Sequence, residues 1–317
     1  MHYKTILAVT DLSANGNEAV QRAAVIAANC GAELHLMYAP PADHPAWPYN
    51  EAHLRELARC VTSTAKVSVK VARRCGASLG DVAAEANCAD LLVSAYRPEC
   101  LVGTFFKGEW HQRVMRLTRC PVLLTRSSGR RPYAKIVVAV DFTEAARQLV
   151  AYAGGVDDRA HLELFHAVSR MDEAKLRSAD VSWEIVKNFR VHQEAQARKR
   201  LHELSQSIST GGRLPTLSIG SGEPGRQTSL QQQDTGASLI VVGKTRRSAA
   251  TEFFCGAISS RVLAWSLSDV LIVPHDRQSS SRAAAKQRMA ASMGNARSDA
   301  KGSRSRQTTT SKSLDAF

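Results

Sequence analysis

The feature of this sequence that most constrains its fold is an internal repeat. Residues 4–11, KTILAVTD, are matched by residues 135–141, KIVVAVD, and each is a short apolar segment that ends in an acid, Asp11 or Asp141. Further along each copy, residues 89–125 align without a gap to residues 237–273. Two copies with the same order of apolar segments predict two domains that share one backbone plan.

The two copies differ in length between these matched ends. The offset grows from 130 residues at Asp11 and Asp141 to 148 at Gly108 and Gly256, so the second copy holds 18 extra residues. They coincide with the polar, charge-rich stretch 182–208, whose pattern predicts a long helix with a solvated face. We expect its apolar residues to face inward; these are Trp183, Ile185, Val186 and Leu201.

Within each copy, apolar strand-like runs alternate with helical segments. The runs LLVS, LIVV, VLLT and VLIV are buried-type segments, typical of parallel strands covered on both faces. The alternation predicts an α/β fold of two tandem Rossmann-like domains with ligands at the carboxyl ends of the strands. The predicted boundaries are 1–126 for the first domain, 127–132 for the linker, 133–275 for the second domain and 276–317 for a tail.

Hydroxyl residues at several predicted helix starts suggest capping. Ser13 and Thr143 stand two positions after the strand-end acids, where a side-chain oxygen can accept from a free backbone N–H. Ser78 lies in GASLG, which also satisfies the G-x-S-x-G pattern of a hydrolase nucleophile. Because the matching loop of the second copy, GSGEPG, lacks that pattern, we interpret Ser78 as the cap of a helix at 80–87.

The charge of the chain is concentrated in the tail. Net charge is +13 overall, and residues 277–317 supply +7 of it with nine Lys/Arg and two Asp. The tail has few large apolar residues, so we expect it to be disordered. A basic arm of this kind can contact nucleic acid, although a solvated extension is the favoured interpretation.

Composition excludes several other classes. Seven cysteines without a CxxC pair, and no HExxH helix, argue against a disulfide framework and against a zinc site. No apolar run approaches the roughly 18–20 residues that span a bilayer, and the start of the chain lacks signal-peptide character. We therefore expect a cytoplasmic protein without membrane contact and with reduced thiols.

The second copy carries the pattern of a phosphate-binding loop. Its strand 239–242 ends at Gly243, and a basic loop with Arg246 leads to Gly256 and then to Ser259 near a helix start. Free N–H groups at a helix start favour an anionic phosphate, and Asp141 should lie on the same sheet edge, within reach of a ribose or base. The alternative is that both glycines serve only as turn residues.

The fingerprint formed by these residues resembles that of the universal stress protein family. It comprises a strand-end Asp, a strand ending in HV, and GxxG, nine residues, then G(S/T). Both copies match, over about residues 3–126 and 133–275, with His166 at the strand-end histidine. The resemblance implies a five-stranded parallel sheet in each domain and adenine-nucleotide contacts in the second. Those contacts would fall on Asp141, Ala167 (through its backbone), Gly243, Arg246, Gly256 and Ser259.

Both copies depart from the fingerprint. In the second, Arg246 replaces a glycine and Ala257 replaces a hydroxyl residue; a guanidinium there could pair with phosphate, but its Cβ takes up space. We expect ATP binding, with any accompanying Mg²⁺, to be weak or lost.

The first copy departs further. Ala95 stands at the Gly243 position, Pro98 at the Arg246 position and Glu109 at the Ala257 position. A carboxylate at that place repels phosphate, so we expect the first copy to bind no nucleotide and to serve as a pairing partner for the second.

The sequence therefore favours a non-catalytic stress-response protein that acts through binding. Its expected partners are the two domains for each other, an adenine nucleotide, and a further copy of the chain in a homodimer. Two alternatives stay open: a slow ATPase, and a nucleic-acid-associated stress factor that uses the basic tail.

Overall fold

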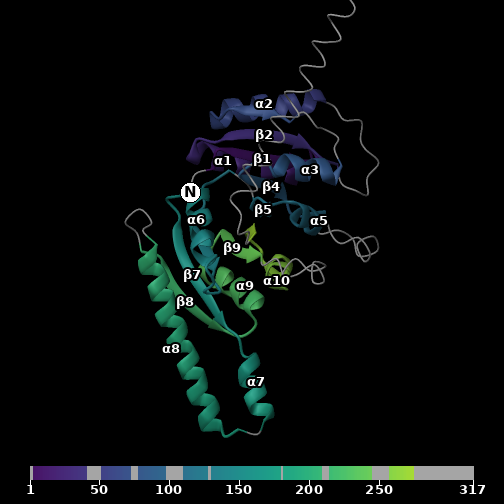
Figure 1. Cartoon of the computed structure of the whole chain (residues 1–317). Coiled ribbons are helices and arrows are strands. Elements are labelled where there is room, and N and C mark those ends of the chain that lie inside the picture. The colour runs from purple at the N-terminus through teal and green to yellow at the C-terminus, as the bar shows by residue number, and fades with distance from the viewer. Residues whose placement is uncertain are drawn as a thin grey trace, which may run out of the picture. The chain divides into compact units, whose positions relative to one another are not determined.

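The computed structural model describes residues 3–40, 51–72, 78–97, 110–127, 130–179, 181–208, 214–244 and 257–274. The predicted tail at 276–317 lies outside these residues. In the first half, strands alternate with helices throughout (Figure 1). The elements are β1 (Thr5–Thr10), α1 (Ala14–Cys30), β2 (Glu33–Tyr38), α2 (Glu51–Ala65), β3 (Val69–Val71), α3 (Leu79–Ala86), β4 (Leu91–Ala95), α5 (Trp110–Leu117) and β5 (Val122–Thr125).

The second half repeats this order with one added helix between its second and third strands. Its elements are β6 (Lys135–Ala139), α6 (Ala146–Val156), β7 (His161–Val168), α7 (Met171–Ser178), α8 (Trp183–Ser207), β8 (Thr216–Ser221), α9 (Pro224–Thr235), β9 (Leu239–Lys244), α10 (Ala257–Trp265) and β10 (Asp269–Pro274).

All ten strands belong to one sheet, in the order β3-β2-β1-β4-β5-β10-β9-β6-β7-β8. Each half contributes five parallel strands in the same relative order, which confirms the predicted doubly wound α/β fold with two related domains. The halves meet where β5 and β10 pair antiparallel, with Val270 opposite Leu124 and Ile272 opposite Val122. The buried-type runs did not predict this seam, since they indicate burial on both faces but not which strands lie at an edge.

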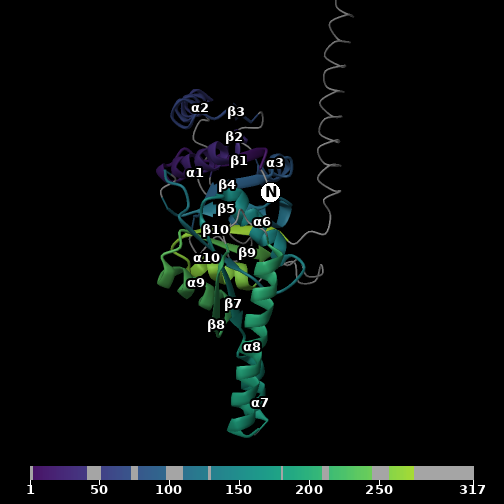
Figure 2. The same cartoon turned by 90° about the vertical axis from the view of Figure 1, so that its left-hand side faces the viewer.

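Helices cover both faces of the sheet, and each core runs through the seam. Alternate strand residues face α1, α2, α6 and α8 in one cluster of buried side chains, and α3, α5 and α10 in another. Figure 2 shows this layering in the second half, with α9 and α10 on one side of the strands and α8 on the other. Both clusters contain residues from both halves, so the two domains share their apolar core.

A buried polar network fixes the segment that joins the halves. Asp269 is fully buried; its carboxylate accepts from Tyr133 Oη at 2.7 Å and from Ser127 N and Oγ at 3.0 Å. Arg22 of α1 lies 3.2 Å from it through Nε, an ion pair without hydrogen-bond geometry, and its guanidinium covers the Tyr133 ring at 4.1 Å. Burial, and then the Asp269 charge, raise the pKa of Tyr133 well above its ordinary value.

The predicted long helix at 182–208 is confirmed as α8, but the prediction of its inward face is half wrong. Val186 and Leu201 are buried, whereas Trp183 and Ile185 are 58% and 56% exposed. In Figure 1, α8 runs along β7 and β8 and then continues past the end of the sheet with α7 beside it. A periodic pattern indicates an inward face only where a neighbour exists, and the first turn of α8 has no strand beneath it.

Two of the three predicted caps are confirmed. Ser13 Oγ accepts from Gly16 N, and Ser78 forms a capping box with Asp81, so Ser78 is a helix cap. Thr143 is the exception. Because α6 begins only at Ala146, the Thr143 hydroxyl turns back to Asp141 and makes no cap bond.

Candidate functional site

Three neighbouring strands, β7, β6 and β9, end at the same edge of the sheet. Ala139 pairs with Phe165 and Val138 pairs with Val241, so Asp141 comes level with Ala167, and Gly243 lies close to that level. Three of the sequence-predicted site residues are thus brought to one edge by strand register alone. Since β6 and β9 lie where the strand order reverses, this edge is the expected ligand crevice of a doubly wound sheet.

The loop after β6 holds Asp141 in a specific conformation. Asp141 Oδ1 accepts from Thr143 N at 3.1 Å and from Thr143 Oγ1 at 2.7 Å, while the residue as a whole is exposed. Phe142 between them has φ 59°, in the left-handed region that bulky side chains rarely adopt. Backbone in this region is strained for a bulky residue and persists only where the surrounding structure holds it.

His166 at the end of β7 faces the same region. Its Nδ1 lies 2.7 Å from the carbonyl oxygen of Val140, and because a carbonyl only accepts, Nδ1 must carry the proton. Burial lowers the pKa of His166, opposed by the Val140 bond and the Asp141 charge. The neutral ring packs against Phe142, with 4.2 Å between the ring centroids and the two planes tilted by 37°. His166 thus lies at the end of its strand, where the fingerprint places it.

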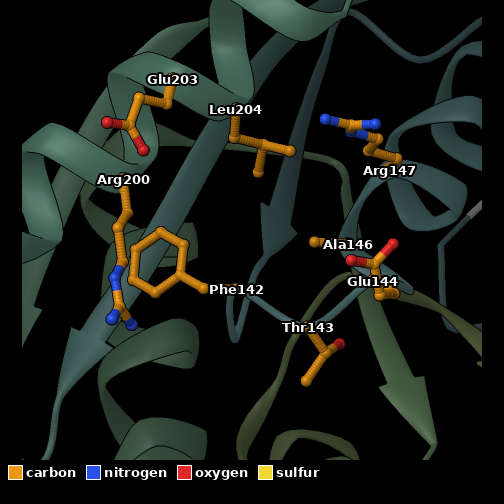
Figure 3. A pocket seen from close by; sticks show the side chains of 8 residues that line it. All are labelled: Phe142, Thr143, Glu144, Ala146, Arg147, Arg200, Glu203 and Leu204. Atoms are coloured by element: carbon orange, nitrogen blue, oxygen red, sulfur yellow. The ribbon is translucent and has the colours of Figure 1, made fainter.

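A cavity of about 220 Å³ opens beside these residues. One wall consists of Asp141, Phe142 and the end of β7, and the opposite wall belongs to α8. A second cavity of about 280 Å³ shares Phe142 and Arg200 with the first and extends along the start of α6 (Figure 3). Polar side chains are therefore gathered around open space next to Asp141.

The remaining predicted residues divide between described and undescribed parts of the chain. Gly243 is half-buried at the end of β9, and Ser259 is buried in the first turn of α10. Arg246 and Gly256 lie outside the described residues. Their roles at a nucleotide phosphate stay predictions.

The first half has the same loop with a different occupant. Asp11 Oδ1 accepts from Ser13 N at 3.0 Å and Oγ at 2.6 Å, and Leu12 has φ 66°, as in the second half. Arg97, two residues after β4, places its Nη2 2.7 Å from the same Asp11 oxygen. The Asp11 side chain is only 11% exposed, so an internal guanidinium covers the acid that the second half leaves open.

Sequence reasoning missed both Arg97 and the α8 wall. Arg97 corresponds to Thr245 of the second copy, a variable position within GxxG, so no motif marked it. Helix α8 has 25 residues where α2 has 15, and no motif marks which of its residues face the cavity. A charge difference at aligned positions next to the loop was the one available signal.

Other kinds of site find no support within the described ranges. These contain no group of three or more His, Cys, Asp or Glu placed to hold a metal ion. Their helices are too short or too polar to cross a bilayer.

A sheet of this strand order, with polar loops at the carboxyl ends of its parallel strands, defines the doubly wound class of α/β proteins. Within that class the chain belongs to the universal stress protein family, which matches residues 2–126 and again residues 132–274. Members of this family are generally non-catalytic stress proteins.

Known relatives agree with this assignment. A universal stress protein from Synechocystis sp. is 29% identical over 153 residues, which is 45% of this chain and 99% of that protein. A protein of unknown function from Pseudomonas aeruginosa PAO1 has a solved structure with a TM-score of 0.61 at 20% identity, covering 86% of this chain and 92% of its own. A universal stress protein from Archaeoglobus fulgidus also has a TM-score of 0.61, at 15% identity, covering 86% and 97%. The two structures share the fold of the whole tandem.

Proposed function

We propose that this chain is a non-catalytic binding protein in which only the second half takes an adenine nucleotide, with weak affinity. The observation that carries this proposal is the contrast between two equivalent acids. Asp141 is exposed beside a cavity, whereas Asp11 is paired with Arg97 at 2.7 Å. A ligand that donates a hydrogen bond to the acid can reach Asp141 directly. At Asp11 it must first displace the ion pair with Arg97.

The residues at the second edge suit a nucleoside. Asp141 has an oxygen available for a ribose hydroxyl or a base amino group, and the half-buried Gly243 lies near it on β9. With Arg246 and Gly256 as the predicted phosphate contacts, the edge combines hydrogen-bond acceptors and a basic loop. Any Mg²⁺ would accompany the phosphates.

Nucleotide binding is tested by isothermal titration of the full chain with ATP. We expect one site per chain, and Asp141→Ala to weaken binding by about tenfold, the usual worth of a charge-assisted hydrogen bond. Asp11→Ala is the matched control, and we expect it to leave the affinity unchanged. Two sites per chain, or equal effects of the two variants, would contradict the proposal.

Phosphate release measured on the same samples separates binding from hydrolysis. We expect no turnover above the buffer rate. Turnover abolished by Asp141→Ala would replace the non-catalytic function by a slow ATPase.

A further inference from the structure

Strand β8 is the outer strand of the second half, and its outer edge carries backbone hydrogen-bonding groups. Gly222 N donates to Val168 O of β7 at 2.9 Å. Because the backbone groups of successive strand residues point to opposite sides, those of Leu217, Ile219 and Ser221 point away from β7. No hydrogen bond to these outward groups occurs within the part of the chain that the structure describes. The edge of β8 therefore offers both N–H donors and C=O acceptors to a further strand.

The two ends of the ten-stranded sheet differ in how well they are protected from strand pairing. At the other end, β3 has three residues, and its Lys70 pairs with Glu33 at 2.5 Å. Short length and charge are the usual protection of an outer strand. By contrast, β8 has six residues, TLSIGS, none of them charged. Pro215 before it has no N–H, which limits pairing to the residues that follow.

The outer edge of β8 is open between the helices that cover the two faces of the sheet. Figure 2 is viewed from this side and shows β8 between α9 and α8. Ser218 Oγ donates to Glu163, which also accepts from Gln231 of α9, so Ser218 faces α9. Ile219 packs against the core cluster on the α8 side, and Leu217 shares that face and is 36% exposed. A strand that adds to β8 meets apolar side chains on the α8 side.

The identical edge of a second copy is the partner that these residues fit best. Antiparallel pairing about a two-fold axis at Ile219 places Ile219 opposite its own copy and Leu217 opposite Ser221. All three positions face outward, so each N–H meets a C=O, and about six hydrogen bonds form. With no charge on the strand, the two copies do not repel each other. The chain already joins its own halves by antiparallel pairing of β5 with β10.

Helix α8 enlarges the surface that such a pair buries. Strands about 4.8 Å apart place two α8 helices, each lying along β7 and β8, roughly 10 Å apart, the ordinary distance between packed helices. The side of α8 opposite to its cavity-lining residues faces the free edge of β8 and carries, at helical spacing, Lys187, Val191, Glu194 and Arg198. This side combines charges of both signs with Val191, which is 58% exposed.

We propose that the free edge of β8 is the surface through which two copies of this chain associate, in a two-fold pair whose axis passes by Ile219. The sheet then continues from one copy into the other, and the two α8 helices lie side by side. The surface does not involve Asp141, so the association is independent of nucleotide binding.

Sedimentation equilibrium of the full chain over a range of concentrations tests the association. We expect a monomer–dimer equilibrium that Leu217→Lys weakens by about tenfold, because a lysine on the edge strand must lose water on pairing. Leu230→Lys is the matched control, since Leu230 on α9 is 39% exposed and lies off the edge. Far-UV circular dichroism checks that both variants are folded.

Two results of this experiment would overturn the proposal. One is a dimer that the two variants weaken equally. The other is a chain that stays monomeric at every concentration, which would leave the edge of β8 to an extended segment of a different protein.

Oxidative cross-linking tests the register of the pair. Ile219→Cys places two thiols at the two-fold axis, with about 5.5 Å between the Cα atoms, so we expect a disulfide-linked dimer. Leu217→Cys is the control, because its own copy lies four residues along the opposing strand, roughly 14 Å away, and should not link. The unaltered chain gives the background from the exposed Cys60. A link at position 217, or none at position 219, would overturn the proposed pairing.

Discussion

The two halves of the chain share a loop and differ in what occupies it. In each, a strand-end acid accepts from a hydroxyl residue two positions on, across a residue with positive φ, Leu12 or Phe142. Among the described residues, the first half covers its acid with Arg97, and the second half places a long helix beside its acid. One backbone plan can thus be kept while the surroundings of its strand-end acid differ between the two copies.

The seam between the halves shows a second contrast within the same plan. Lys244 Nζ donates to Met115 O at 2.6 Å near the end of α5, and Arg126 donates to Leu263 O near the end of α10. Met115 and Leu263 are equivalent in the repeat, but the two basic residues are not. The C-terminal ends of α5 and α10 are therefore each contacted by a cation from the opposite half. The two cations come from positions that are not equivalent in the repeat.

The largest expected effect on stability is at the buried network around Asp269. The two halves differ there, because Asp269 corresponds to Pro121 in the first copy. Asp269→Ala removes the carboxylate that neutralises the buried Arg22 and should lower the free energy of unfolding by about 3–5 kcal/mol. Urea denaturation followed by circular dichroism measures it. Asp158→Ala, on an exposed residue, is the control, and equal losses in both variants would refute the role of the network.

Removing one of the paired helix-end cations should have a smaller effect. Lys244→Met keeps much of the buried stem but withdraws the charge from Met115 O, and we expect a loss of about 1–2 kcal/mol in the free energy of unfolding. Arg126→Met should cost a similar amount if the two contacts are equivalent. Urea denaturation measures both variants. A loss of stability in only one of them would show that the two helix-end contacts do not contribute equally.

Removing the Arg97–Asp11 ion pair of the first half should lower the free energy of unfolding by a smaller amount. Arg97→Thr introduces the residue of the second copy and removes an ion pair in which Arg97 is 30% exposed, so we expect a loss below about 1 kcal/mol. ATP stoichiometry should stay at one per chain, because Pro98 and Glu109 remain. A second ATP site in this variant would show that Arg97 alone closes the first half.

The smallest expected effect is on the pH dependence of stability. It should arise in the second half alone, because His166 at the end of β7 corresponds to Tyr38 at the end of β2. Burial lowers the pKa of His166 below its ordinary value of 6.5, so the unfolded chain binds this proton more readily than the folded one. Stability from the neutral ring is present above pH 6.5 and is lost as pH falls through the lower, folded pKa.

Replacing the ring tests this assignment. We expect the stability of His166→Phe to be less sensitive to pH than that of the unaltered chain between pH 7 and acid conditions, as measured by urea denaturation. Asp141 and Arg200 also act on this ring, so Arg200→Gln is included as the comparison. An unchanged pH profile in His166→Phe would assign the dependence to another group.

Much of the fold could be predicted because the repeat and the local patterns agree. The strand-end acids, the Ser13 and Ser78 caps and the helix at 182–208 each follow from chemistry within a few residues. The β5–β10 pairing could not be predicted in this way, because hydrogen bonding between two edge strands leaves no mark on either sequence. The inward orientation of Trp183 failed for a related reason, since it depends on where the sheet ends.

The sequence predicted the residues of the candidate site that belong to the motif, but not the other residues around it. Register brings Asp141, Ala167 and Gly243 to one edge, as expected from parallel strands. The Arg97–Asp11 pair and the α8 wall depend on long-range packing of residues without a motif. Such contacts become visible only when strand ends and helices are placed in space.

The antiparallel pairing of β5 with β10 has a consequence for how this molecule meets other copies of itself. Each domain presents its fifth strand to the other, and both strands belong to one polypeptide. The association of the two domains is therefore intramolecular and does not weaken on dilution, unlike that of two separate chains. Since those strand edges are already hydrogen-bonded, a second molecule must attach through other surfaces, such as the outer strands β3 and β8 at the ends of the sheet.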